Sequence, residues 1–86
     1  MRITEVNITP IKPQNGLMGF ASIVFEDCLY LGSIGVYGLL GGTGYRITYP
    51  TKKVGDRDLN IYHPISRELG KVVEIAITEK ARKIFG

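Results

Sequence analysis

The sequence predicts an α+β fold, with a five-stranded antiparallel sheet followed by one long C-terminal helix, in a single domain that spans residues 1–86. Two observations support this prediction. As far as residue 63, short apolar runs with period-2 alternation are separated by turn-forming residues, which is typical of strands. Beyond that point apolar residues recur at steps of three and four, which is typical of an amphipathic helix.

Five segments are predicted to be strands. Pro10 is expected to end the first, and turns are expected at Asn15-Gly16 and Glu26-Asp27, before and after the second. A hairpin connection at 41–44 (GGTG) leads into the fourth, and the segment 50–58 is expected to be a loop before the fifth. The predicted strands are 2–9, 17–26, 28–40, 45–49 and 59–63.

The last segment is predicted to be a helix of about 20 residues, roughly 30 Å long. It begins after Ser66, a good N-cap residue that follows Pro64 closely. Gly70 lowers the stability of this helix by about 1 kcal/mol relative to alanine. One largely apolar stripe is expected to pack on the sheet and consists of Leu69, Val72, Val73, Ala76, Ile77, Lys80, Ala81 and Ile84.

The second and third predicted strands are largely apolar on both faces, although antiparallel sheets usually keep one polar face. A single helix covers only one of these faces. Two explanations are open for the other: irregular edges, bulges at the glycines and loops cover it, or a second subunit buries it. We favour a homodimer, because a domain of 86 residues gains useful burial from a partner subunit.

Composition places the chain among ordinary globular domains. Apolar residues make up 44% of it and charged residues 22%, which is not typical of disordered or fibrous proteins. No apolar run approaches the roughly 20 residues that span a bilayer, and no signal-peptide pattern opens the sequence. A lone cysteine cannot form an internal disulfide, which fits a reducing compartment. We expect a cytoplasmic protein without a membrane partner.

Few residues suit catalysis. His63, the only histidine, is interpreted as a structural hydrogen-bonding group, and Cys28, the only cysteine, as a small core residue. A catalytic zinc site needs about three protein ligands, and these two residues are 35 positions apart. Asp56 and Asp58 flank Arg57 in the manner of a solvated turn. We therefore expect no enzyme activity, no cofactor, no metal ion and no small-molecule substrate.

The net charge of +3 is unevenly distributed. The first 50 residues carry three basic and three acidic side chains, whereas the last 36 carry eight basic and five acidic ones. This asymmetry favours an acidic or phosphate-bearing partner. The helix dipole accounts for part of this excess, because it favours cations at the C-terminus of a helix. The basic residues at the predicted C-terminus are Lys80, Arg82 and Lys83.

Five basic residues have no such local explanation. Arg67 and Lys71 are four residues apart on one helix face, so they repel each other, and they lie near the positive end of the dipole. The residues that we predict to contact a phosphate-bearing partner are Lys52, Lys53, Arg57, Arg67 and Lys71. No helix-turn-helix, zinc or RNP signature indicates which bases are read, or whether DNA or RNA is preferred.

The segments 49–53 (YPTKK) and 61–65 (IYHPI), followed by the helix, resemble the SpoVG family. Members of that family carry a Pro-Ser-Lys-Arg-like basic loop and then a His-Pro-Ile/Val segment before a C-terminal helix. The segments 21–23 (ASI) and 34–36 (IGV) resemble family elements more loosely. The resemblance implies a small fold of five strands and a helix, a homodimer, and a bacterial cytoplasmic regulator that binds DNA and RNA and is linked to septation and sporulation.

The residues that correspond to the family's basic loop and helix start are Lys52, Lys53, Ser66, Arg67 and Lys71. Two features depart from the family. Gly35 stands where an arginine is usual, and the turn 39–44 is longer and more apolar than expected. An alternative hypothesis is a protein-interaction module in cell-division control, which docks a partner on the second face of the sheet and does not bind nucleic acid itself.

Overall fold

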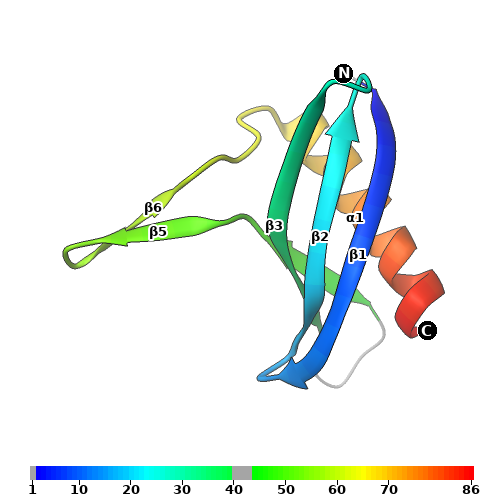
Figure 1. Ribbon diagram of the computed structural model, residues 1–86, viewed down its shortest axis with the longest axis horizontal. Helices are drawn as coiled ribbons and strands as arrows, with labels where there is room; N and C mark the ends of the chain where they lie inside the picture. The colour runs from blue at the N-terminus through cyan, green and yellow to red at the C-terminus, as the bar shows by residue number, and fades with distance from the viewer. Residues whose placement is uncertain (1, 40–43) are drawn as a thin grey trace.

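The chain folds into a sheet of four antiparallel strands that packs on one helix, and a hairpin of two further strands extends away from both (Figure 1). The computed structural model describes residues 2–39 and 44–86. The predicted α+β class, with an antiparallel sheet and one C-terminal helix, is confirmed. The elements are β1 (Ile3–Gln14), β2 (Leu17–Phe25), β3 (Leu29–Gly38), β4 (Tyr45–Thr48), β5 (Thr51–Val54), β6 (Arg57–Asn60) and α1 (Arg67–Phe85).

The main sheet has the strand order β1-β2-β3-β4; a two-residue turn, 15–16, joins β1 to β2, and a three-residue connection, 26–28, joins β2 to β3. Asn15 and Gly16 have φ angles of 52° and 90°, and Glu26 and Asp27 have φ angles of 50° and 55°. Positive φ at both central positions is typical of the type I′ turn, whose twist matches that of a hairpin. Both predicted turns are therefore confirmed. The predicted connection at 41–44 lies, except for Gly44, outside the described residues.

Strand β1 continues to Gln14 and passes Pro10, where the sequence predicted its end. That prediction was wrong because β1 is an edge strand, in which a proline can leave its missing N–H on the open side of the sheet. Pro10 pairs with Gly19 of β2, and a Cβ atom on Gly19 would lie 2.7 Å from the carbonyl oxygen of Thr9. The two strands approach each other closely here because Gly19 has no side chain.

The prediction of a fifth sheet strand at 59–63 was also wrong. The segment 50–58, predicted to be a loop, contains all of β5 and the start of β6, and β6 ends at Asn60. These two strands pair with each other in a separate two-stranded sheet. Gly55, with a φ angle of 63°, permits the two-residue turn that brings them together. The pairing is local, so the segment does not need an edge of the main sheet.

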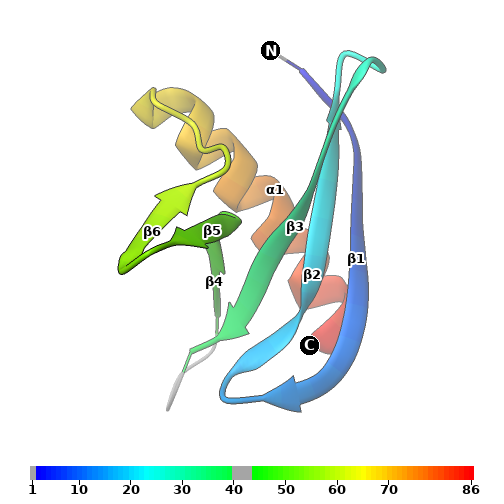
Figure 2. The ribbon, with the colours of Figure 1, turned by 60° about the vertical axis from the view of Figure 1, so that its left-hand side comes forward.

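The core lies between α1 and one face of the main sheet (Figure 2). Ser66 caps the helix as predicted, since its Oγ accepts a hydrogen bond from the Leu69 N–H at 3.1 Å. The apolar stripe of the helix is narrower than predicted, because Val72 and Ile84 are exposed. No helix in the described ranges is long and apolar enough to cross a membrane. The buried core residues are Ala21, Ile23, Phe25, Ile34, Val36, Val73, Ile77 and Ala81.

The face of the sheet that points away from α1 is less apolar than predicted. The alternation of β3 is interrupted at Ser33, which has a φ angle of 62° and lies within a register shift between β2 and β3. Leu31 pairs with Ile23 and Ile34 pairs with Ala21, so both β3 residues point toward the helix although they are three positions apart. A regular alternation through the predicted strand 28–40 would place Leu31 and Ile34 on opposite faces, and the irregularity at Ser33 is the reason that they share one.

Candidate nucleic-acid interface

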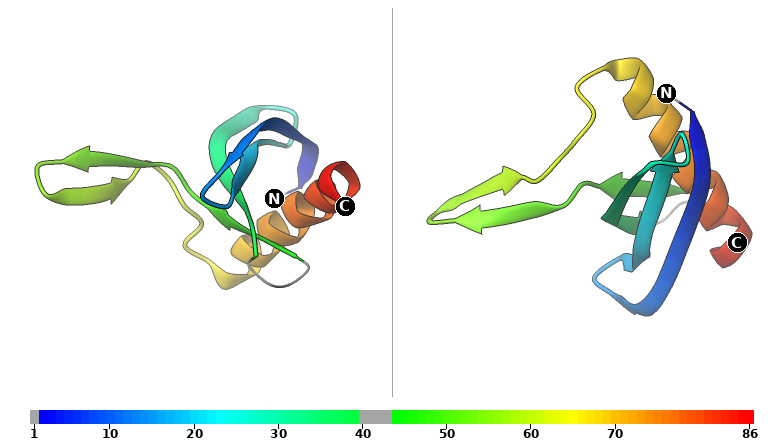
Figure 3. Two further views of the ribbon diagram at one scale, coloured as in Figure 1. Left: turned by 90° about the horizontal axis from the view of Figure 1, so that it is seen from below. Right: turned by 45° about the horizontal axis from the view of Figure 1, so that its top comes forward.

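The hairpin of β5 and β6, residues 51–60, carries three of the five basic residues predicted to bind phosphate and is called the arm below. Every residue of the arm is exposed. Figures 1 and 3 show that the arm projects from the body of the protein. Its basic side chains are therefore open to a large polyanion from more than one direction.

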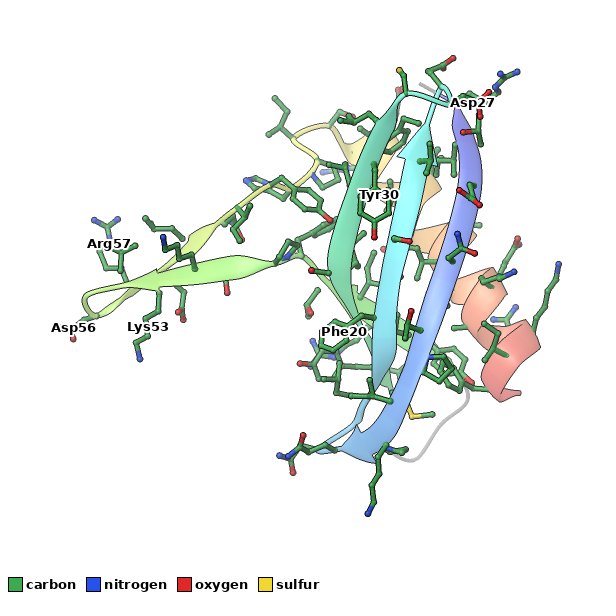
Figure 4. All side chains as sticks on the ribbon, in the orientation of Figure 1. Phe20, Asp27, Tyr30, Lys53, Asp56 and Arg57 are labelled. Carbon is green, nitrogen blue, oxygen red and sulfur yellow. The ribbon has the colours of Figure 1, made fainter. Side chains whose placement is uncertain are left out.

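The arm presents cations on both of its faces. Lys52 pairs with Leu59, and the alternation along β6 places Arg57 on the same face as Leu59. Lys53 lies on the other face, directly opposite Asp58. Figure 4 shows the side chains of Lys53 and Arg57 on opposite sides of the ribbon. The face of Lys52 and Arg57 has no acidic partner in the pairing, so it is the more cationic of the two.

The other two predicted residues, Arg67 and Lys71, lie one turn apart at the start of α1, and both are exposed. They line one open groove of about 370 Å³, together with Glu74 and His63. Glu74 offsets part of the repulsion between the two cations. The Nδ1 atom of His63 lies 3.1 Å from the carbonyl oxygen of Pro64, which fits its interpretation as a structural hydrogen-bonding group.

The arm and the start of α1 lie apart in every view of Figures 1, 2 and 3. The predicted set of five cations therefore forms two groups. The arm group consists of Lys52, Lys53 and Arg57, and the helix group consists of Arg67 and Lys71. One phosphate cannot contact both groups, but the successive phosphates of a nucleic-acid chain can.

Two tyrosines that sequence analysis missed hold the base of the arm. Tyr49 precedes β5 and Tyr62 follows β6, and their rings meet edge to face with 6.0 Å between centroids. The Tyr62 hydroxyl donates a hydrogen bond to the Gly32 carbonyl oxygen of β3 at 2.6 Å. The signal that could have indicated them is their equal separation in sequence from the turn at 55–56.

The environment of Tyr62 leads us to expect that the stability of the fold depends on pH in the alkaline range. Burial, and then the nearby Tyr49 and Tyr30, raise the pKa of Tyr62 to about 12, whereas a tyrosine in the unfolded chain titrates near 10. The unfolded chain therefore releases this proton first. The contribution of Tyr62 to the free energy of unfolding is complete below about pH 10 and is lost as the pH rises toward 12.

Tyr62→Phe is therefore expected to lower stability at neutral pH, by about 0.5–1.5 kcal/mol for the missing hydrogen bond, and to lose less stability than the wild type between about pH 10 and 12. Urea unfolding at a series of pH values measures both effects. Tyr37→Phe is the matched control, since the Tyr37 ring lies beside Arg46 and is not among the groups that raise the pKa of Tyr62. Equal losses for Tyr62→Phe and the wild type across this range would contradict the assignment.

Cys28 is exposed, so the prediction that it is a core residue was wrong. It directly follows the turn at 26–27, and its N–H donates a hydrogen bond to the carbonyl oxygen of Phe25 at 2.9 Å. A residue at this point in a tight hairpin turn lies at the tip of the sheet, away from the helix. Within residues 2–39 and 44–86, no group of three or more His, Cys, Asp or Glu residues is arranged to hold a metal ion.

The geometry defines a class of small α+β proteins in which a helix covers one side of an antiparallel sheet and a basic arm extends from it. The family model described as SpoVG matches residues 1–83. Several relatives carry the description "Putative septation protein SpoVG". The protein of Treponema denticola is 34% identical over 84 residues, which cover 96% of this chain and 88% of that protein.

The relative from Finegoldia magna is 35% identical over 86 residues, with 99% of this chain and 78% of that protein covered. The relative from Phytoplasma australiense is 32% identical over 86 residues, with 99% of this chain and 88% of that protein covered. This chain belongs to the SpoVG family.

Proposed function

We propose that this protein is a cytoplasmic, homodimeric regulator that binds nucleic acid and is linked to septation or sporulation. The observation that carries the proposal is the exposed arm with Lys52, Lys53 and Arg57. In this proposal Arg67 and Lys71, at the start of α1, provide the protein with a second contact to the nucleic acid. The proposed protein has no catalytic role.

The physical basis is the attraction between fixed cations and phosphates. Each lysine or arginine that neutralises a phosphate releases a condensed counterion, and this release makes binding favourable at low salt. The arm is held at its base and exposed along its length, so its cations can reach a chain of phosphates without steric hindrance from the sheet. This electrostatic contribution does not depend on sequence, and it acts on both DNA and RNA.

Exposed apolar side chains on the arm support the homodimer. Val54 is 52% exposed, Leu59 is 45% exposed and Ile61, just beyond β6, is 62% exposed. An isolated two-stranded hairpin is only marginally stable in water. A second subunit that contacts these side chains would stabilise the arm and would bring the two copies of the basic groups close together.

The link to septation rests on the names of the relatives, which are described as septation proteins. A regulator of this kind acts by occupying nucleic acid, and such a function needs no catalytic group. Which process the protein regulates is determined by the nucleic acid that it binds in the cell.

Fluorescence anisotropy with labelled random-sequence DNA and RNA tests the proposal. Both probes are expected to bind at about 50 mM salt, and the affinity is expected to fall steeply toward about 200 mM. Light scattering on the same samples is expected to give twice the mass of one chain. If neither nucleic acid binds at low salt, the proposal is overturned and a protein-interaction module in cell-division control is the better account.

A further inference from the structure

Three aromatic side chains lie on the outer face of the main sheet, which is the face opposite α1. Phe20 alternates with the buried Ala21, so it points outward and is 42% exposed. Tyr30 pairs with Val24, an outward-facing neighbour of the buried Phe25, and is 67% exposed. Figure 4 shows Phe20 and Tyr30 in front of the sheet, with α1 behind it.

Tyr37 belongs to the same face. Gly35 lies between the buried residues Ile34 and Val36, so a side chain there would point outward, and Tyr37 is two residues further along the strand on the same face. A Cβ atom at that position would lie 3.2 Å from Cε1 of the Tyr37 ring. The ring therefore covers Gly35 on the outer face. Phe20 is the direct β2 partner of Gly35, which brings the two aromatic residues to the same part of the sheet.

Glycines give two of these rings a place to lie along the sheet. A Cβ atom on Gly32 would be 2.9 Å from both Cε1 and the hydroxyl oxygen of Tyr30, just as one on Gly35 would meet Tyr37. Tyr30 stays 67% exposed in this position, so most of its side chain remains accessible to a ligand. The glycines thus leave room for the two tyrosine rings close to the backbone of the sheet.

A cation lies on the same face. The guanidinium carbon of Arg46 is 4.9 Å from the centroid of the Tyr37 ring, and Arg46 pairs with Tyr37 between β3 and β4. A guanidinium held in this way presents a planar, positively charged surface that stacks on a base or pairs with a phosphate. The aromatic side chains and Arg46 together combine the two features that proteins use to bind single strands.

Polar side chains separate the aromatic ones. Thr9 pairs with Phe20, Asn7 pairs with Ser22, and Thr48 pairs with Gly35, and all of these positions belong to the outer face. Val24, the β2 partner of Tyr30, is apolar and its β1 partner Glu5 is acidic, so the face mixes apolar, polar and charged side chains and is not the continuous apolar surface that is typical of a homodimer interface. Hydroxyl and amide groups between aromatic rings are instead suited to the edges of unpaired bases.

We propose that the outer face of the main sheet binds single-stranded nucleic acid by stacking unpaired bases on Tyr30, on Phe20 and on the Arg46 guanidinium, which itself lies over the Tyr37 ring. Bases inside a duplex are stacked on each other, so their faces are not available to these rings. The inference rests on the proposed nucleic-acid binding and adds a second contact to it: the arm and the helix start bind phosphates of any strand, whereas the sheet selects unpaired bases.

The test compares an unstructured single-stranded RNA with a duplex of the same sequence. Tyr30→Ala is expected to weaken single-strand binding by about 5- to 150-fold, the effect of losing one base–aromatic stack, and to change duplex binding less than twofold. Tyr30→Phe is expected to keep the affinity for both, because stacking needs the ring and not the hydroxyl. Ile65→Ala is the matched surface control, since Ile65 is 94% exposed and lies outside the sheet.

Each result leads to a distinct conclusion. An unchanged single-strand affinity for Tyr30→Ala, or an equal loss for single strand and duplex, overturns the stacking site while the proposed function stands. A wild-type protein that binds neither probe overturns both proposals. If Tyr30→Ala halves the mass measured by light scattering, the outer face is a contact between subunits, which also overturns the site. An unchanged thermal unfolding midpoint shows that a loss of binding is not a loss of fold.

Discussion

Ile77→Ala is expected to lower the free energy of unfolding by about 2–5 kcal/mol. Ile77 has no exposed surface and lies in the middle of the buried stripe of α1, between Val73 and Ala81. Truncation removes buried methyl and methylene groups and leaves a cavity that the neighbouring side chains only partly fill. Domains of this size are stable by only about 5–15 kcal/mol, so the loss is a large fraction of the total.

The same helix supplies a matched control for this substitution. Ile75 is also an isoleucine in the interior of α1, but it is 53% exposed. Ile75→Ala removes the same atoms, mostly from water-exposed surface, and is expected to cost less than about 1 kcal/mol. Urea unfolding of both variants measures the difference. Similar losses for the two would show that the helix does not pack on the sheet through Val73, Ile77 and Ala81.

A large loss of nucleic-acid affinity is expected when the basic residues of the arm are replaced. Replacing Lys52, Lys53 and Arg57 together by alanine should weaken binding to all nucleic-acid sequences. It should also reduce the slope of log affinity against log salt concentration by about one for each phosphate that the variant no longer neutralises. The reason is that each phosphate without a cationic partner keeps its condensed counterion. Anisotropy titrations at a series of salt concentrations measure the slope.

A triple alanine variant at Lys80, Arg82 and Lys83 removes the same charge from the other end of the molecule. Arg82 and Lys83 lie in the last turn of α1, where they interact favourably with the helix dipole. This variant is expected to change the slope much less than the arm variant does. If both variants reduce the affinity and the slope equally, net charge rather than the arm governs binding.

Local chemistry made much of the fold predictable. The steps of three and four residues and the cap at Ser66 predicted α1 close to its observed bounds, because capping and amphipathicity act within a few residues. The turns at 15–16 and 26–27 were predicted for the same reason, since positive φ favours a small set of residues. The resemblance to the SpoVG family, carried by 49–53 and 61–65, was confirmed by the match over residues 1–83.

Errors arose where long-range pairing decides the structure. The position of β1 at the sheet edge decides whether Pro10 ends it, and the register between β2 and β3 decides which face Leu31 occupies. The two lysines at 52–53 suggested a solvated loop. They are part of a strand because the turn at 55–56 provides them with a partner strand.

The basic residues themselves were determined by the sequence: the charge count and the helix dipole were enough to separate Lys80, Arg82 and Lys83 from the other five. Only the tertiary structure decided that those five form two groups, one on a projecting arm and one in a groove at the start of α1. The physical reason is that charge and local propensity belong to the residue and its neighbours in the chain. The direction in which a residue points, and the residues that share its surface, depend on contacts between distant segments, such as the hydrogen bond from Tyr62 to Gly32.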